Sequence, residues 1–172
     1  MKFLLIIVSL FPVVIKTSGQ QVLIDSTWKK ESFAIAELGV DASFDFTGRD
    51  LTVSPTIAVE VTAIENWLEL ELGFTPNFGS GEWDIDILFK KPWDFSQKVE
   101  FMFGAGLVLE HSTNNENVKT NSLGGEIALD FMFWPFKNKK FGWYLEPAYD
   151  YSFAKGHDQS IGISGGLLIS IR

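Results

Sequence analysis

The sequence contains no cysteine, which excludes disulfide bonds, thiolate metal sites and the lipid-modified cysteine of bacterial lipoproteins. Histidine is scarce too, since His111 and His157 are the only two and do not have the spacing of a metal-binding pair. Lys and Arg number 14 against 22 Asp and Glu, and the net charge is −8. We therefore expect no nucleic-acid partner and no bound cofactor.

Long apolar segments are also missing from most of the chain. The one extended apolar run covers residues 3–15, which is shorter than the roughly twenty residues that a transmembrane helix needs. Lys2 precedes this run and the small residues 17–19 follow it, as in a secretory signal peptide. We predict a signal peptide over 1–19, cleaved after Gly19, and one further domain over 20–172. The alternative for the apolar run is a buried N-terminal strand.

What the sequence does contain is alternation with a period of two, from Glu31 to the C-terminus. Apolar residues occupy one parity of each segment, and polar or small residues occupy the other, which is typical of strands with two different faces. Because only helices and closed barrels satisfy their backbone groups in lipid, a membrane span here requires strands. We predict an all-β fold, an eight-stranded antiparallel up-and-down transmembrane β-barrel, with strands over 33–46, 51–64, 67–75, 82–90, 98–111, 121–134, 141–153 and 160–172.

The connections between these segments differ in length. Glu65 and Asn66 form a turn of about two residues, while the polar segment 112–120 is the longest loop. The links 91–97 and 135–140 contain prolines and are compact. With an even number of strands, the short turn and the long loop fall on opposite rims. Outer-membrane barrels have short periplasmic turns and longer outer loops, so we expect both termini on the periplasmic side.

Alternation alone does not decide which face is inside. The alternative to a membrane barrel is a soluble secreted barrel that binds an apolar ligand in an apolar interior. Bulky rings on the apolar parity would overfill the interior of an eight-stranded barrel, whereas the many small residues of the polar parity suit a narrow lumen. Aromatic residues also gather near the strand ends, as in the girdles that contact outer-membrane lipid. The predicted girdle residues are Trp67, Trp83, Trp134, Trp143, Tyr151 and Phe153.

Two stretches carry a resemblance to a known family. These are VSPTIAVEVTAIENWLELELGFTPNF and the closing SIGISGGLLISI. The chain after its signal resembles the small outer-membrane β-barrels of Gram-negative bacteria, the OmpA-type transmembrane class. This resemblance implies secretion, cleavage of the signal and residence in the bacterial outer membrane. One departure is the end at Ile171-Arg172, because many members end in an aromatic residue that helps the assembly machinery to recognise the last strand.

Acidic residues are concentrated on the polar parity, which carries fifteen of the 22 acids, while the apolar parity of the predicted strands carries none. The same polar faces carry three bases, Lys90, Lys98 and Arg172. We therefore predict an acidic lumen in which Lys90 and Arg172 are the basic members. The predicted acidic cluster comprises Glu60, Glu69, Glu71, Asp84, Asp86, Glu100, Glu126, Asp130, Glu146 and Asp150.

A narrow lumen does not hold many unpaired carboxylates without a cost in free energy. Some acids can be protonated and hydrogen-bonded to each other, or hydroxyl groups and water can bind them. Alternatively, cations such as Ca²⁺ or Mg²⁺ can occupy the interior, since both ions prefer oxygen ligands. The functional hypothesis is therefore a lumen that binds small solutes or cations, or lets them pass. The structural alternative is a hydrogen-bonded polar filling, and the sequence does not identify a metal.

An enzymatic alternative rests on His111. It is followed by Ser112 and Thr113, and Glu110 or Glu116 is nearby in the sequence. This group faintly resembles outer-membrane lipid A deacylases and acyltransferases, which use a histidine, a hydroxyl group and an acid. A lipid-modifying enzyme that uses His111 is thus a second hypothesis for function.

Overall fold

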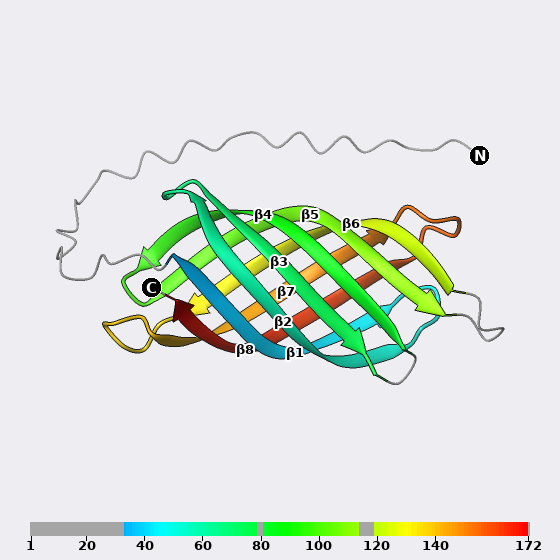
Figure 1. The fold of residues 1–172 in the computed structure, drawn as a ribbon, viewed down its shortest axis with the longest axis horizontal. Helices are drawn as coiled ribbons and strands as arrows, with labels where there is room; N and C mark the ends of the chain where they lie inside the picture. The colour runs from blue at the N-terminus through cyan, green and yellow to red at the C-terminus, as the bar shows by residue number, and fades with distance from the viewer. Residues whose placement is uncertain (1–32, 79–80, 114–118, 172) are drawn as a thin grey trace.

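The computed structural model describes residues 33–78, 81–113 and 119–171, which form a closed barrel of eight antiparallel strands (Figure 1). Each strand pairs with the next in sequence, and β8 closes the barrel against β1. The predicted fold class is confirmed. No helix within the described residues is long and apolar enough to cross a membrane. The strands are β1 (Ala34–Asp45), β2 (Leu51–Ile64), β3 (Leu68–Asn77), β4 (Glu82–Ser96), β5 (Val99–Thr113), β6 (Lys119–Phe133), β7 (Phe141–Ser152) and β8 (Gln159–Ile171).

The predicted signal peptide over 1–19 and the predicted lumen base Arg172 lie outside the described residues. Most of the predicted strand boundaries agree with the structure to within a few residues, but β4 is an exception. It continues past Lys90 to Ser96, so that most of the predicted link 91–97 is strand. Its pairing with β3 ends at Lys90, and from there onward only β5 lies beside it. Pro92 is therefore tolerated, because this part of β4 has a neighbouring strand on one side only. A proline without an N–H does not interrupt hydrogen bonds to a second strand there.

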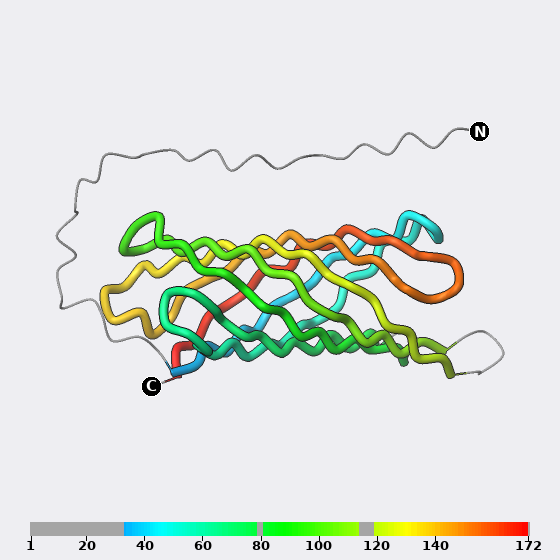
Figure 2. Tube along the Cα trace, turned by 90° about the horizontal axis from the view of Figure 1, so that it is seen from above, coloured from blue at the N-terminus to red at the C-terminus, as the bar shows by residue number. Residues whose placement is uncertain are grey.

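The two ends of the barrel differ (Figures 1 and 2). The first residue of β1 and the last of β8 lie together at one end, which we name the terminal end, with the β2–β3, β4–β5 and β6–β7 connections. The other four connections join the strands at the opposite end, which we name the loop end. The β2–β3 turn is tight, because Asn66 adopts a left-handed conformation (φ 58°) and Trp67 N donates to Ile64 O over 2.9 Å. The turn lies at the end opposite to Thr113 and Lys119, as predicted for the two sides of the segment 112–120.

The apolar parity of the strands faces outward. Along β5, Leu107 is 52 % exposed whereas Val108, the next residue, is 6 % exposed. The inward parity carries the charge, since Glu37, Glu60 and Lys90 are all buried. A soluble barrel would place these two faces the other way around. The exterior is instead a belt of exposed aliphatic and aromatic side chains, as membrane lipid requires.

Lys91 is an exception on this apolar exterior, and it lies on the part of β4 that was not predicted. Its Nζ donates to the carbonyl oxygen of Asn66 over 2.6 Å and lies 5.8 Å from the centre of the Trp93 ring. Lys91 therefore lies near the terminal end of the belt. There its apolar stem covers neighbouring side chains while its ammonium group reaches a polar partner.

Five of the six predicted girdle residues lie on the outside of the barrel or in a turn at its rim. Trp67, Trp143 and Phe153 are exposed, while Trp83 and Tyr151 are half-buried. Trp67 and Trp143 are at the terminal end, and the other three are at the loop end. This arrangement fits two aromatic bands, one near each membrane surface.

Trp134 was wrongly predicted to belong to the girdle. It is 2 % exposed and lies inside the barrel, where its Nε1 donates to Glu100 Oε2 over 2.9 Å. The reason is its parity, because Trp134 follows Asp130 and Met132 at intervals of two, and both of these side chains point inward.

Candidate functional site

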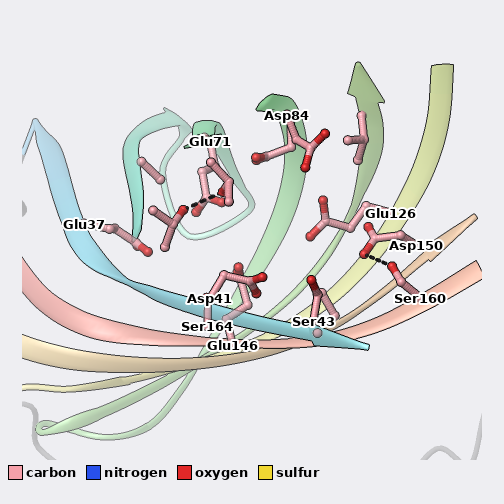
Figure 3. Close-up of a pocket in the computed structure, with 18 of the residues that line it drawn as sticks. Glu37, Asp41, Ser43, Glu71, Asp84, Glu126, Glu146, Asp150, Ser160 and Ser164 are labelled. Carbon is pink, nitrogen blue, oxygen red and sulfur yellow. Dashed lines mark hydrogen bonds between the residues drawn. The ribbon is translucent and has the colours of Figure 1, made fainter. Parts of the chain in front are cut away.

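A cavity of about 140 Å³ occupies the lumen from its middle toward the loop end (Figure 3). Among the described residues that line it there is no basic side chain, and all eight strands contribute at least one polar, charged or small residue. So many carboxylates around a narrow space create a strongly negative potential, which attracts cations. The acidic lining consists of Glu37, Asp41, Glu71, Asp84, Asp86, Glu110, Glu126, Glu146 and Asp150.

Small residues on the inward parity make room for these side chains. Gly73 of β3 is the clearest example, because a Cβ atom built there would lie only 2.3 Å from Asp86 Oδ1. The absence of a side chain at Gly73 thus lets the carboxylate of Asp86 lie directly against β3. Ala58 and Ala148 also line the cavity without filling it.

Hydroxyl groups bind several of the carboxylates near the loop end. Ser122 Oγ donates to Glu110 Oε2 over 2.6 Å, and Ser152 Oγ donates to the same oxygen over 3.2 Å. Ser160 Oγ donates to Asp150 Oδ2 over 3.0 Å (Figure 3). Part of the acidic charge is therefore held by hydrogen bonds from serine, which is one of the arrangements considered from the sequence.

Below the cavity lies a buried ion-pair cluster around Lys90, which we name the Lys90 node. Lys90 is fully buried, and its Nζ donates to Glu71 Oε2 and to Glu146 Oε2. The same nitrogen lies 3.3 Å from Asp130 Oδ2 and 4.0 Å from Glu60 Oε2. One ammonium group thus contacts four carboxylates that come from four different strands.

Gly104 of β5 provides the space for the Lys90 side chain. A Cβ atom built at Gly104 would lie 2.9 Å from Lys90 Cγ, which is closer than real contacts allow. The two residues are direct partners in the β4–β5 register. The path of the lysine stem across the lumen therefore depends on glycine at this position.

Three buried carboxylate oxygens near Lys90 have no hydrogen-bond partner among the described residues. They are Glu37 Oε1, Glu60 Oε2 and Asp130 Oδ1. Together with Glu71, these three residues bring one carboxylate oxygen each to within 4.8 Å of one another. A buried polar atom without a partner requires a physical explanation, and a cation held among the oxygens is one.

At the terminal end the lumen is filled by apolar side chains. Trp134 and Tyr144 pack there in one buried cluster with two methionines and Leu168. Lys139 closes the side of this cluster, because its Nζ donates to the carboxylate of Glu100 that also accepts from Trp134. Within the described residues, these side chains therefore fill the lumen between the cavity and the terminal end. We name the buried cluster at the terminal end the apolar plug. It consists of Met102, Met132, Trp134, Tyr144 and Leu168.

The structure divides the predicted acidic cluster into four groups. Asp84, Asp86, Glu126 and Asp150 line the cavity only. Glu60 and Asp130 lie in the Lys90 node, and Glu71 and Glu146 contribute to both places. Glu69 and Glu100 lie nearer the terminal end, where both are half-buried.

Glu37 was missed as a member of the predicted cluster, although it is 1 % exposed and lies beside the Lys90 node. A sequence signal was available, because Glu37 lies on the polar parity of its predicted strand, as Asp41 does. The apolar plug was missed as well. Its signal is the presence of Met102, Met132 and Leu168 on a parity that is mostly polar or small.

The environment of His111 differs from the one that the enzymatic hypothesis requires. His111 points outward, stacks on the Trp83 ring at 4.9 Å and has its Nδ1 2.6 Å from Asn121 Oδ1. Glu110 points into the lumen and accepts hydrogen bonds from serines there. The two residues thus lie on opposite faces of β5, and Glu116 is outside the described residues.

No protein-family model and no curated protein sequence matches the chain. Solved structures do match it. Neisserial surface protein A (NspA) superposes with a TM-score of 0.61 at 15 % identity, over 80 % of this chain and 96 % of that one. The N-terminal β-barrel domain of Pseudomonas aeruginosa OprF gives 0.57 at 10 % identity, over 80 % and 98 %. A de novo designed transmembrane β-barrel gives 0.53 at 12 % identity, over 83 % and 99 %.

The chain has the fold of the small outer-membrane β-barrels. At these identities the likeness is one of architecture, and the family resemblance inferred from the sequence is confirmed at that level. The fold places the exposed apolar belt in lipid and the acidic cavity in the lumen. The function of the cavity has to be argued from its own residues.

Proposed function

We propose that this protein resides in the bacterial outer membrane and binds small cations in its acidic cavity, which they enter from the loop end. The observation that carries the proposal is the cavity lining, which has nine carboxylates and no basic side chain among the described residues. Binding energy comes from the combined potential of these carboxylates in a space with little water to screen it.

Location and orientation are supported by the exterior of the barrel and by its connections. The exposed apolar belt requires lipid, and the fold matches outer-membrane barrels. The tight turn at Asn66 lies at the terminal end, which corresponds to the periplasmic side of such barrels. The cavity then faces the exterior of the cell, and the predicted signal peptide accounts for export.

Binding is favoured over passage because the lumen is closed at the terminal end. A cation that reaches the bottom of the cavity meets the Lys90 node, and beyond the node lie the close-packed side chains of the apolar plug. Both layers lie between the cavity and the periplasmic rim. A cation would therefore leave by the route along which it entered.

Isothermal titration of Mg²⁺ into the detergent-solubilised protein tests the binding proposal. The variant Asp84→Asn/Glu126→Gln/Asp150→Asn removes three cavity carboxylates and should lose most of the heat of binding. A matched control, Asp50→Asn/Glu65→Gln/Asp158→Asn, removes three acids of exposed connections and should bind as the wild type does. Equal binding by wild type and cavity variant would leave the hydrogen-bonded polar filling as the better account.

Conductance and fractionation test the remaining parts of the proposal. The wild-type barrel should conduct no ions in a planar bilayer, and a steady cation-selective current would contradict the closed lumen. In cells, the protein should fractionate with the outer membrane and migrate on gels with heat-modifiable mobility. Its release from membranes by salt or alkali would refute membrane residence.

A further inference from the structure

We propose that Glu37, Glu60, Glu71 and Asp130 form a specific site for one divalent cation of the size of Ca²⁺, beneath the open cavity. These residues belong to β1, β2, β3 and β6, so that the fold, and not a local sequence motif, brings them together. The route by which the ion enters rests on the proposed function. The site itself rests on its own geometry.

The spacing of the oxygen atoms fits a calcium ion. One carboxylate oxygen from each residue lies within 4.8 Å of the others. Ca²⁺ binds oxygen ligands at about 2.3–2.6 Å, so ligands on opposite sides of the ion are separated by roughly 4.6–5.2 Å. Mg²⁺ requires distances of about 2.0–2.1 Å in a strict octahedron and usually retains several water molecules. The 4.8 Å limit admits either ion, but four buried carboxylate ligands in place of water favour Ca²⁺ over Mg²⁺.

Unpartnered oxygen atoms are the independent observation that indicates a ligand. Glu37 Oε1, Glu60 Oε2 and Asp130 Oδ1 are buried and have no hydrogen-bond partner among the described residues. Asp130 is especially informative, because its Oδ2 faces Lys90 while its Oδ1 has no partner. A buried anionic oxygen without a partner costs free energy that an ion bound between the carboxylates would offset.

The charge balance indicates a divalent ion. Lys90 supplies one positive charge, and its hydrogen bonds go to Glu71, Glu146 and Asp130. Glu60 is only within 4.0 Å of the Lys90 nitrogen, and no hydrogen bond joins the two. One ammonium group therefore neutralises only part of the surrounding acidic charge. A second, doubly charged cation on the Glu37 and Glu60 side of the cluster would neutralise much of the remainder.

An entry route to this site exists within the lumen. Glu37 and Glu71 line the cavity, and their side chains are drawn at its wall in Figure 3. Glu60 and Asp130 lie behind them and are almost fully buried. A hydrated ion attracted into the cavity can thus lose its water stepwise, meeting Glu37 and Glu71 before the two deeper carboxylates.

Equilibrium dialysis of the full chain in detergent against ⁴⁵Ca²⁺, in the presence of excess Mg²⁺, tests the site. The wild type should retain one Ca²⁺ per barrel. Glu60→Gln and Asp130→Asn should each weaken Ca²⁺ binding at least about tenfold, since the loss of even an outer-shell partner commonly has that effect. The control Glu65→Gln, in the exposed β2–β3 turn, should leave the retained Ca²⁺ unchanged. Glu126→Gln removes a cavity carboxylate outside the four and should weaken Ca²⁺ binding less than Glu60→Gln does. Heat-modifiable mobility verifies the folding of each variant.

The outcomes separate this inference from the proposed function. If Ca²⁺ binds weakly and Glu126→Gln reduces binding as much as Glu60→Gln does, the specific site is refuted and the cavity proposal stands. If one Ca²⁺ is retained while Mg²⁺ titration shows no cavity binding, the cavity proposal fails and the site stands. If one of the two variants does not fold, Glu37→Gln replaces it, because Glu37 supplies another of the four oxygens. Unchanged Ca²⁺ binding in the folded variants refutes the site.

Discussion

The two halves of the lumen are built from the same parity of the same strands, yet they have opposite character. Toward the loop end, carboxylates and small residues surround a cavity of about 140 Å³. Toward the terminal end, Met102, Met132, Trp134 and Leu168 fill the space. The Lys90 node lies between them. The comparison shows that an inward-facing parity is not uniformly polar, and that a few bulky residues decide where a barrel is open and where it is closed.

Removing the ammonium group between the two halves should have the largest effect on stability. Lys90→Met keeps the length of the side chain but leaves several buried carboxylates unpaired, so we expect a loss of about 5 kcal/mol in the free energy of unfolding. Urea titration in detergent, followed by gel mobility, measures this loss.

A rescue variant and a neighbouring lysine serve as controls for this prediction. Lys90→Met/Glu71→Gln/Glu146→Gln removes the ammonium group together with two of the carboxylates that it contacts. This variant should recover much of the lost stability. Lys91→Met alters an exterior lysine and should cost no more than about 1 kcal/mol. Wild-type stability in Lys90→Met would show that the node does not hold the halves together.

The apolar half should be sensitive to loss of volume. Trp134→Ala removes a buried ring and its hydrogen bond to Glu100, and we expect a loss of about 3–4 kcal/mol. Trp143→Ala removes a ring of the same size from the exposed side of β7 and should cost less. The same urea titration measures both variants. An equal loss of unfolding free energy in both variants would indicate that the Trp134 ring contributes no more than an exposed girdle ring does.

An intermediate effect is expected where the node contacts the barrel wall. Gly104→Ala places a Cβ atom against Lys90 Cγ, and overpacking of this kind costs about 1–3 kcal/mol. Gly125→Ala, on the outward face of β6, places its Cβ atom 3.2 Å from the end of the Phe153 ring and 3.7 Å from the Gly106 carbonyl oxygen, and should cost less. The difference between the two midpoints of unfolding is the measured quantity. Similar midpoints would indicate that the lysine stem moves aside freely.

The smallest effect is expected in the acidic half. Asp84→Asn removes one carboxylate from a cavity wall that also contains Glu110 and Asp150, so mutual repulsion falls. We expect stability to change by less than about 1 kcal/mol, with a slight gain at low salt that disappears at high salt. Unfolding at two ionic strengths provides the test. A large loss of stability would show that Asp84 is a structural member of the barrel.

Much of the fold was predictable because the period of two is imposed along the whole chain. The alternation at residues such as Leu107 and Val108 identifies the lipid-facing and lumen-facing sides directly. The inward direction of the acids follows from the same pattern. The end of β4 was not predictable, since Pro92 usually ends a strand and its tolerance depends on the absence of β3 beside it.

The candidate site was predictable only in part. Parity identifies Glu60 and Asp130 as inward, but it does not reveal that strands distant in the sequence bring their oxygens within reach of one ion. That proximity depends on the stagger of the strands around the barrel and on the path of the Lys90 side chain. Trp134 is a case in which parity alone was sufficient. Its large ring near a strand end suggested a membrane surface, but its parity correctly indicated the interior.

The extension of β4 beyond its partner β3 also bears on how barrels avoid one another during assembly. From Lys91 to Ser96 this hairpin arm exposes one backbone edge, and a free edge is a template for pairing with another chain. Pro92 removes a donor from that edge, and Lys91 places a charge beside it. These two residues hinder a second chain from adding a strand there, so this open side of the wall is protected against aggregation.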